Sequence, residues 1–223
     1  MKQRAFTLAE VLITLGIIGI VAAMTIPTLM ENVQDYQLKQ AWKKEFSVLQ
    51  QATVSYLQDN ATFKNTYASF WHDYLKSDYV NYLRTIKVCS GDPNPETTYG
   101  YCWSTAGTTK YLNGSVVASN SLPLGNGSAG VVLQDGAYII FAYQDNTCAS
   151  INVTPPGNEG LANICGWIAV DVNGAKNPNV VGKDIFAVWV LENKIIPFGT
   201  MNYASTCSTS DTGLGCSAQY LTQ

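Results

Sequence analysis

The chain has 223 residues, of which 47% are apolar and 13% charged, and its formal net charge is −3 at pH 7. An average soluble protein carries about 25% charged residues. The basic residues gather nowhere beyond Lys43-Lys44, so we expect no nucleic-acid partner. The sequence also has no phosphate-binding loop, dinucleotide-binding glycine motif, zinc-protease motif or nucleophile elbow. We therefore expect a protein that is not an enzyme.

The N-terminus holds the most unusual stretch, RAFTLAEVLITLGIIGIVAAMTIP. Twenty uncharged residues separate Glu10 from Glu31, close to the roughly 20 that a membrane-spanning helix needs. A secretory signal, a plain membrane anchor and a buried core helix all account for the apolar residues, but none accounts for Glu10. A carboxylate costs about 2.5–3.5 kcal/mol at the centre of a bilayer, so its presence at the head of this run needs a reason.

This stretch closely resembles the class III leader and N-terminal helix of type IV pilins and type II secretion pseudopilins. The resemblance implies that residues 1–5 are a leader and that a prepilin peptidase cuts between Ala5 and Phe6. It also implies that the same enzyme N-methylates Phe6. Ala5 departs from the glycine that the family usually has before the cut, but it is also a small residue.

Three further positions match residues that the family uses in assembly. Glu10 corresponds to the glutamate four residues after the phenylalanine, and Gly19 and Pro27 correspond to a glycine and a proline that loosen the helix. The resemblance implies that Glu10 of one subunit pairs with the methylated Phe6 amine of its neighbour. Such an ion pair gains strength where water is scarce, which explains why the carboxylate is tolerated.

Beyond Pro27 the pattern becomes amphipathic. Apolar residues recur at spacings of three and four, which is typical of a helix with one buried face: Leu38, Trp42, Phe46, Leu49, Ala52 and Tyr56. We expect one long helix over 6–59, transmembrane over 6–30 and amphipathic over 31–59.

Residues 60–223 are expected to form the globular head. A helical turn or two at 70–83, containing a surface histidine, His72, should precede a disulfide-braced loop that holds Cys89 and Cys102. The C-terminal half then alternates strands and turns, as in VVLQDGAYIIFAY, CGWIAVDVNG and DIFAVWVLENKIIPFG. These patterns predict four or five antiparallel strands. The expected fold class is α+β, with the long N-terminal helix packed on an antiparallel sheet, as in pilins.

All six cysteines follow the apolar run, and an even number in a chain that enters a membrane favours disulfides in an oxidising compartment. Fifteen pairings are possible in principle. Sequence order favours three local pairs: Cys89–Cys102, Cys148–Cys165 and Cys207–Cys216.

One turn, DVNGAKNPNVVGKDIF, contains oxygen-bearing side chains that calcium prefers as ligands. We consider Asp171, Asn173, Asn179 and Asp184 as a candidate calcium site, although the spacing is not that of an EF-hand. The alternative, which the pattern favours, is a turn network in which Asp and Asn side chains cap backbone amides. No cofactor is required by any pattern in the chain.

The resemblance implies a structural subunit of a type IV pilus-like or type II secretion-like filament, and it leaves open which of the two. The expected partners are other pilin-like subunits, the prepilin peptidase and the inner-membrane assembly machinery. The subunit would lie in the bacterial inner membrane before assembly and in a periplasmic or surface filament afterwards. The alternative is a membrane-anchored extracellular binding or adhesin module that does not polymerise, and such a module needs neither Glu10 nor the Ala5-Phe6 junction.

Overall fold

The computed structural model describes residues 7–63, 79–89, 109–118, 121, 129–144, 147–148, 164–174, 176–200 and 206–223. The chain divides into two compact units, Met1–Gln37 and Leu38–Gln223, which are described separately below. Helix α1, Leu8–Asn60, contributes residues to both units. It matches the long helix predicted over 6–59, and it continues through Pro27 without interruption.

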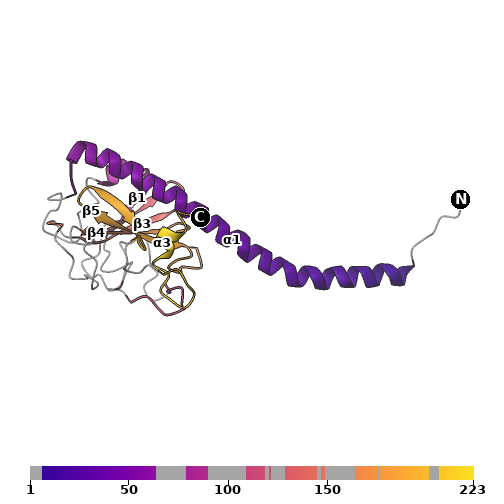
Figure 1. The fold of residues 1–223 in the computed structure, drawn as a ribbon. Helices are drawn as coiled ribbons and strands as arrows, with labels where there is room; N and C mark the ends of the chain where they lie inside the picture. Colours follow the sequence, from indigo (N-terminus) through magenta and orange to yellow (C-terminus); the bar gives the residue numbers. More distant parts are fainter. Residues whose placement is uncertain are drawn as a thin grey trace. The chain divides into compact units, whose positions relative to one another are not determined.

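The second unit is built on one six-stranded antiparallel sheet, whose strand order follows the sequence, β1 to β6 (Figure 1). The strands are β1 (Thr85–Cys89), β2 (Ala129–Leu133), β3 (Tyr138–Gln144), β4 (Ile164–Asp171), β5 (Ile185–Leu191) and β6 (Lys194–Pro197). Two short helices accompany them, η1 (Tyr79–Tyr82) and α3 (Cys216–Gln219). The α+β fold class predicted from the sequence is confirmed.

Local turn chemistry explains the hairpins. Between β2 and β3, the Asp135 carboxylate accepts a hydrogen bond of 3.2 Å from the Ala137 amide. Gly136 adopts a φ of 93°, which side chains disfavour. The predicted turn at Glu192-Asn193 likewise joins β5 to β6.

The first strand corrects the sequence analysis, which placed Cys89 in a loop and expected four or five strands. Residues 85–89 instead pair with β2 as an edge strand. Ile86 and Val88 are 66% and 45% exposed, so β1 lacks the half-buried alternation by which strands are recognised in sequence. In the predicted helical region 70–83, the described part is η1, while His72 lies outside the described residues.

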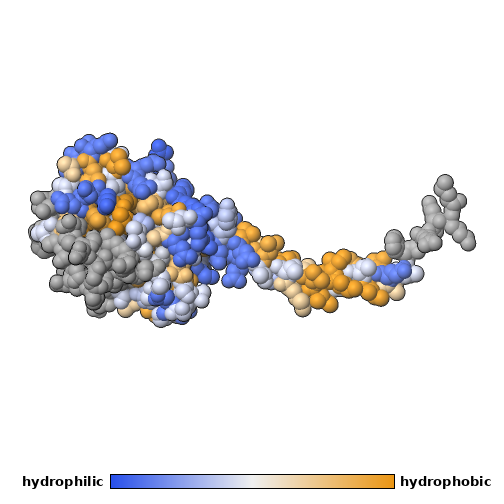
Figure 2. All heavy atoms as spheres, in the orientation of Figure 1, coloured by the Kyte–Doolittle hydropathy of each residue, from blue (hydrophilic) through white to orange (hydrophobic). Residues whose placement is uncertain are grey.

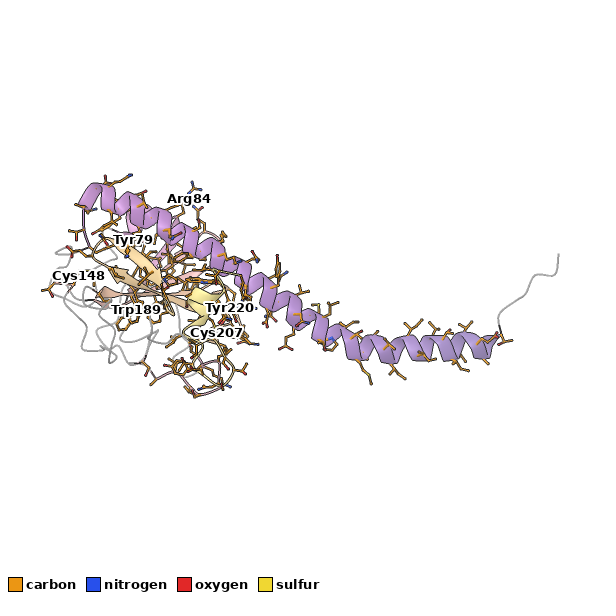
Figure 3. The ribbon with its side chains drawn as sticks, viewed as in Figure 1. Tyr79, Arg84, Cys148, Trp189, Cys207 and Tyr220 are labelled. Carbon is orange, nitrogen blue, oxygen red and sulfur yellow. A yellow bond between two sulfur atoms is a disulfide. The ribbon has the colours of Figure 1, made fainter. Side chains whose placement is uncertain are left out.

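The second half of α1 covers one face of the sheet. The indole of Trp42 is fully buried and stacks on the Phe186 ring at 4.8 Å between centroids. Its Nε1 donates a 2.8 Å hydrogen bond to the Ser217 carbonyl, which links α1 to α3. Further along α1, the Tyr79 hydroxyl donates to the Leu49 carbonyl at 3.0 Å (Figure 3). Aromatic packing and these buried hydrogen bonds fix the helix on the sheet.

The opposite face of the sheet forms a second apolar layer. Its residues on β5 are those that the alternation predicted to share one face: Ile185, Ala187, Trp189 and Leu191. Trp189 stacks on Phe198 at 4.0 Å between ring centroids, and Val117 and Leu214 cover this layer from outside the sheet. Because both faces are covered, every residue of β4 and β5 is buried.

Two of the three predicted disulfides are confirmed. Cys148 is bonded to Cys165 and Cys207 to Cys216. Cys89 is also disulfide-bonded, and its predicted partner, Cys102, lies outside the described residues. The first bond ties the segment after β3 to the start of β4, and the second closes the C-terminal loop onto α3.

Candidate functional site

The first unit presents an apolar surface that its own described residues do not bury. A stretch of 18 residues in this part of α1 is strongly apolar, and none of it is buried by the described residues. Large side chains such as Leu12, Ile18 and Met24 are 61%, 63% and 74% exposed. Figure 2 shows the outer part of α1 as a nearly continuous apolar band. By length and composition this helix could cross a membrane, a criterion that a signal sequence would also satisfy.

Glu10 takes part in a capping box at the start of this helix. Its Oε2 accepts hydrogen bonds from the Thr7 amide at 2.9 Å and from the Thr7 hydroxyl at 2.8 Å. In return, the Thr7 hydroxyl accepts a bond of 3.3 Å from the Glu10 amide. This reciprocal arrangement satisfies amides that a helix start leaves without partners. Glu10 therefore has a role within its own chain, which the sequence analysis missed although the T-x-x-E pattern could have indicated it.

Gly16 and Gly19 make no close packing contact with the described part of the chain. A Cβ atom added to either glycine would meet no atom within 4 Å. Steric crowding within the described part of the chain therefore does not require glycine at these positions. Two explanations for these glycines remain. One is their low helix propensity, which costs about 1 kcal/mol per residue relative to alanine, and the other is close contact with a molecule outside the chain.

Comparison with known families adds a decisive observation about this segment. Residues 1–26 match the family model described as the prokaryotic N-terminal methylation motif. The chain carries the class III leader of a type IV pilin-like prepilin. The leader and the apolar helix that follows it fit membrane anchoring before assembly. No curated protein and no solved structure matches the chain.

The match ends before the head begins, so it concerns processing and the apolar helix alone. Ala5 and Phe6, the predicted cleavage junction, lie within the matched residues but outside those that the structure describes. The roles assigned to Glu10, Gly19 and Pro27 stay predictions.

The predicted oxygen-rich turn lies between β4 and β5. Asp171 and Asp184 are both fully buried. Asp171 Oδ1 accepts the Asn173 amide at 3.1 Å, and the two oxygens of Asp184 accept the Asn179 and Val180 amides at 2.7 Å each. The network of Asp side chains capping backbone amides is therefore confirmed.

Electrostatics in this turn disfavour two charged carboxylates. Burial, reinforced by repulsion from Asp184, raises the pKa of Asp171 to about 9, against the lowering effect of the Asn173 and Gly174 amides. Burial also raises the pKa of Asp184 above its usual value, although the Val180 and Asn179 amides oppose the shift. The turn brings all four predicted residues together at one end of the sheet.

A second buried acid was missed by the sequence analysis. Glu45 is 1% exposed, and its Oε1 lies 3.3 Å from Lys44 Nζ, which also pairs with Asp135 in the β2–β3 turn. Burial and the hydrogen bond and charge of Asp135 raise the pKa of Glu45 to about 7, while Lys44 lowers it. Glu45 follows Trp42 by three positions and precedes Leu49 by four, so its place on the apolar stripe could have indicated burial.

Proposed function

We propose that this protein is a structural subunit of a type IV pilus-like or type II secretion-like filament. One observation carries the proposal: a methylation motif leads directly into the first part of α1, an apolar stretch that none of the described residues buries. Lipid can cover such a helix before assembly, and the helices of other subunits can cover it afterwards. Van der Waals packing between the apolar helices would then supply most of the cohesion.

The capping box suggests how Glu10 could serve two partners. The Thr7 donors converge on Oε2, and Oε1 accepts no hydrogen bond from any described residue. After cleavage, the methylated amine of Phe6 from a neighbouring subunit would bind Oε1 while Thr7 continues to hold the carboxylate in place. The pair would fix the axial register between subunits, as buried polar residues fix the register of coiled coils.

In this arrangement the peptidase and the membrane assembly machinery act on the first unit, and the head faces the compartment in which its disulfides form. The covered sheet and the two disulfides of the described head suit a surface that must persist outside the cytoplasm. The role proposed is structural: the protein would work by packing and pairing, with no chemical step of its own after processing.

The test compares two substitutions of Glu10 in cells that carry the peptidase and assembly machinery. Glu10→Ala removes both the charge and the cap, whereas Glu10→Gln removes the charge but retains a side chain that can cap Thr7. Glu31→Gln is the matched control, because it removes one charge at the far end of the same apolar run. Cleavage is followed by N-terminal analysis of the mature chain, and assembly by the amount of protein in sheared or pelleted filaments.

We expect all three variants to be cut before Phe6, and only the two Glu10 variants to lose filaments, by at least tenfold. Normal filament yield from Glu10→Gln with loss in Glu10→Ala would reduce Glu10 to a helix cap and contradict the pairing. A mature wild-type chain that begins elsewhere, or that never enters a filament, would overturn the proposed function itself.

A further inference from the structure

Three oxygen atoms in the turn between β4 and β5 are buried without a hydrogen-bond partner: Asp171 Oδ2, Asn173 Oδ1 and Asn179 Oδ1. Buried polar atoms are nearly always paired, and leaving one unpaired costs about 1–3 kcal/mol. Asp171 is fully buried and Asn179 is 5% exposed. Backbone capping accounts for one oxygen of Asp171 and for both oxygens of Asp184, but it leaves these three atoms unexplained.

The amide groups of the two asparagines are oriented by their nitrogen atoms. Asn173 Nδ2 donates to the Asn177 carbonyl at 3.1 Å, and Asn179 Nδ2 donates to the Asn177 side-chain oxygen at 3.3 Å. Rotating the Asn173 amide by 180° would set its oxygen against the Asn177 backbone carbonyl. Rotating the Asn179 amide alone would set its oxygen against the side-chain oxygen of Asn177. Asp171 Oδ2 and Asn173 Oδ1 are therefore unpaired acceptors, and the turn has acceptors in excess of donors.

The two buried carboxylates of the turn also indicate that a cation is lacking. Among the described residues, neither Asp171 nor Asp184 forms an ion pair with a lysine or arginine. Buried charges are normally paired or coordinate a metal. In the described residues, no three or more His, Cys, Asp or Glu side chains are grouped so that they could hold a metal ion. A cation here would therefore be bound by two carboxylates together with amide oxygens.

We propose that Asp171, Asn173, Asn179 and Asp184 bind a calcium ion. Calcium takes six to eight oxygen ligands from carboxylates, amide side chains, backbone carbonyls and water in variable geometry. Two carboxylates balance its charge, and the three unpaired oxygens find a partner. Magnesium suits the turn less well, because it demands octahedral geometry and retains most of its water. This inference does not depend on whether the subunit forms a filament.

The position of the turn gives the ion a structural role. Gly174 has a φ of 66° and packs so closely on the β2–β3 turn that a Cβ would lie 2.5 Å from the Gly136 carbonyl oxygen. At the other end, a Cβ on Gly182 would lie 2.8 Å from the Gly213 carbonyl oxygen and 3.0 Å from Cys216 Sγ. A bound ion would thus stabilise the turn together with the hairpin on one side and the disulfide-closed C-terminal loop on the other.

The experiment uses the full chain in detergent after removal of metals with a chelator. Calcium binding is measured by titration calorimetry, and thermal unfolding is measured with and without 1 mM calcium. Terbium, a luminescent calcium substitute, gives a local signal, because Tyr138 pairs with Asp171 across the sheet and its ring lies 3.3 Å from a Cβ built on Gly174.

Two variants separate binding from folding. Asn179→Gly removes one unpaired oxygen and retains a residue that accepts the φ of 52° at this position. Asp184→Asn removes one of the two carboxylate charges. The control is Asp211→Asn, which changes a carboxylate that caps the Thr212 amide elsewhere in the head.

We expect calcium to raise the unfolding temperature of the wild-type chain and of Asp211→Asn. Affinity should fall at least tenfold in Asn179→Gly and below detection in Asp184→Asn, with loss of the terbium signal. Because Asn179→Gly keeps the fold, its metal-free unfolding temperature should stay near that of the wild type. Absence of calcium binding by the wild type at millimolar concentration would overturn the proposal, and so would binding that both variants retain.

Discussion

The two parts of α1 differ in the burial of their apolar side chains although they belong to one helix. Over the first unit, nearly every side chain is exposed, and the apolar residues surround the helix without a polar face. From Leu38 onward, only one side is buried, and every fourth or third residue packs on the sheet: Leu38, Trp42, Glu45, Leu49, Ala52 and Tyr56. The apolar side chains of the first part have no hydrophobic core to pack into. Those of the second part form the hydrophobic core of the head together with the sheet.

This difference separates folding from assembly. The stability of the head should depend on the second part of the helix, where contacts lie within the chain. The first part should matter only when lipid or another subunit supplies its contacts. A substitution in one part should therefore leave the property of the other part unchanged, and each prediction below tests that separation.

The largest effect should come from Trp42→Ala. It removes a fully buried indole, its stacking on Phe186 and its hydrogen bond to Ser217, which we expect to cost about 3–5 kcal/mol of unfolding free energy. Ile17→Ala, the control in the first unit, truncates a side chain that is 58% exposed and should change head stability by less than about 0.5 kcal/mol. Denaturant unfolding followed by circular dichroism measures both changes in unfolding free energy. Comparable losses in the two variants would contradict the separation of folding from assembly.

Replacing the C-terminal disulfide should have the next largest effect. Cys207 and Cys216 are 9 residues apart, and closing a loop of that length is worth about 3 kcal/mol in the chain-entropy description. A double serine variant should lower the unfolding free energy of the head by about that amount. Helicity of the first unit in micelles, followed by amide exchange, should not change. An intact stability would mean that α3 is held by packing alone.

Glu45 should make the head less stable as the pH rises. Its pKa is about 7 in the fold against 4.5 for an ordinary glutamate, so the folded state binds the proton more tightly. The stabilisation is complete below about pH 4.5 and is lost as the pH rises through about 7. One pKa unit corresponds to about 1.4 kcal/mol, so we expect a loss on the order of 1–3 kcal/mol.

Glu45→Gln should reduce this dependence by the share that Glu45 contributes, because a neutral amide can still donate to Asp135. The raised pKa values of Asp171 and Asp184 account for the part that persists. The pKa of Asp135 is about 2: burial raises it, but hydrogen bonds from Glu45, Lys44 and Ala137 outweigh burial. Its contribution is lost only as the pH falls from 3.8 to about 2, outside the window for Glu45. Glu31→Gln, in the first unit, should retain the wild-type slope in denaturant melts at a series of pH values. A slope unchanged in Glu45→Gln would assign the pH dependence to another group.

The smallest effect should come from Gly16→Ala. Open space surrounds this position, so the substitution should stabilise the local helix by about 1 kcal/mol. Amide exchange around residue 16 should slow about fivefold, with no change in the head. Gly174→Ala is the opposite case, because its Cβ would collide with the Gly136 carbonyl, and it should destabilise the head by more than 1 kcal/mol. A filament defect in Gly16→Ala would indicate that neighbouring subunits need the glycine.

The sequence predicted the parts of the fold that local chemistry determines. The Asp135-Gly136 turn and the alternation from Ile185 to Leu191 each depend on residues that are neighbours in the chain, and both are confirmed. Edge strand β1 was missed because Ile86 and Val88 are exposed, so its pattern carries no burial signal. Glu45 was missed because a charged residue is normally predicted to lie on the surface. Its position on the apolar stripe of the helix was not considered.

The candidate sites show the same limit. The leader and Glu10 are recognisable because their spacing is fixed along the chain. The Thr7 bonds that hold Glu10 were missed, although the T-x-x-E spacing is also local and is the signature of a capping box. In the turn from Asp171 to Asp184, the residue types predicted backbone caps. Which oxygen atoms the caps leave unpaired depends on amide orientation and burial, and neither is encoded in a local pattern.

The bond from Trp42 to the Ser217 carbonyl has a consequence for the order of events during export. The two residues are 175 positions apart, and such distant contacts close late in folding. In the export that the proposed function implies, Trp42 would cross the membrane early and would remain without its partner until Ser217 had also crossed. Until then its indole and the face of α1 around it stay uncovered. The head would therefore be completed on the far side of the membrane, after nearly the whole chain has been delivered, and an arrested intermediate should present that helix face to chaperones.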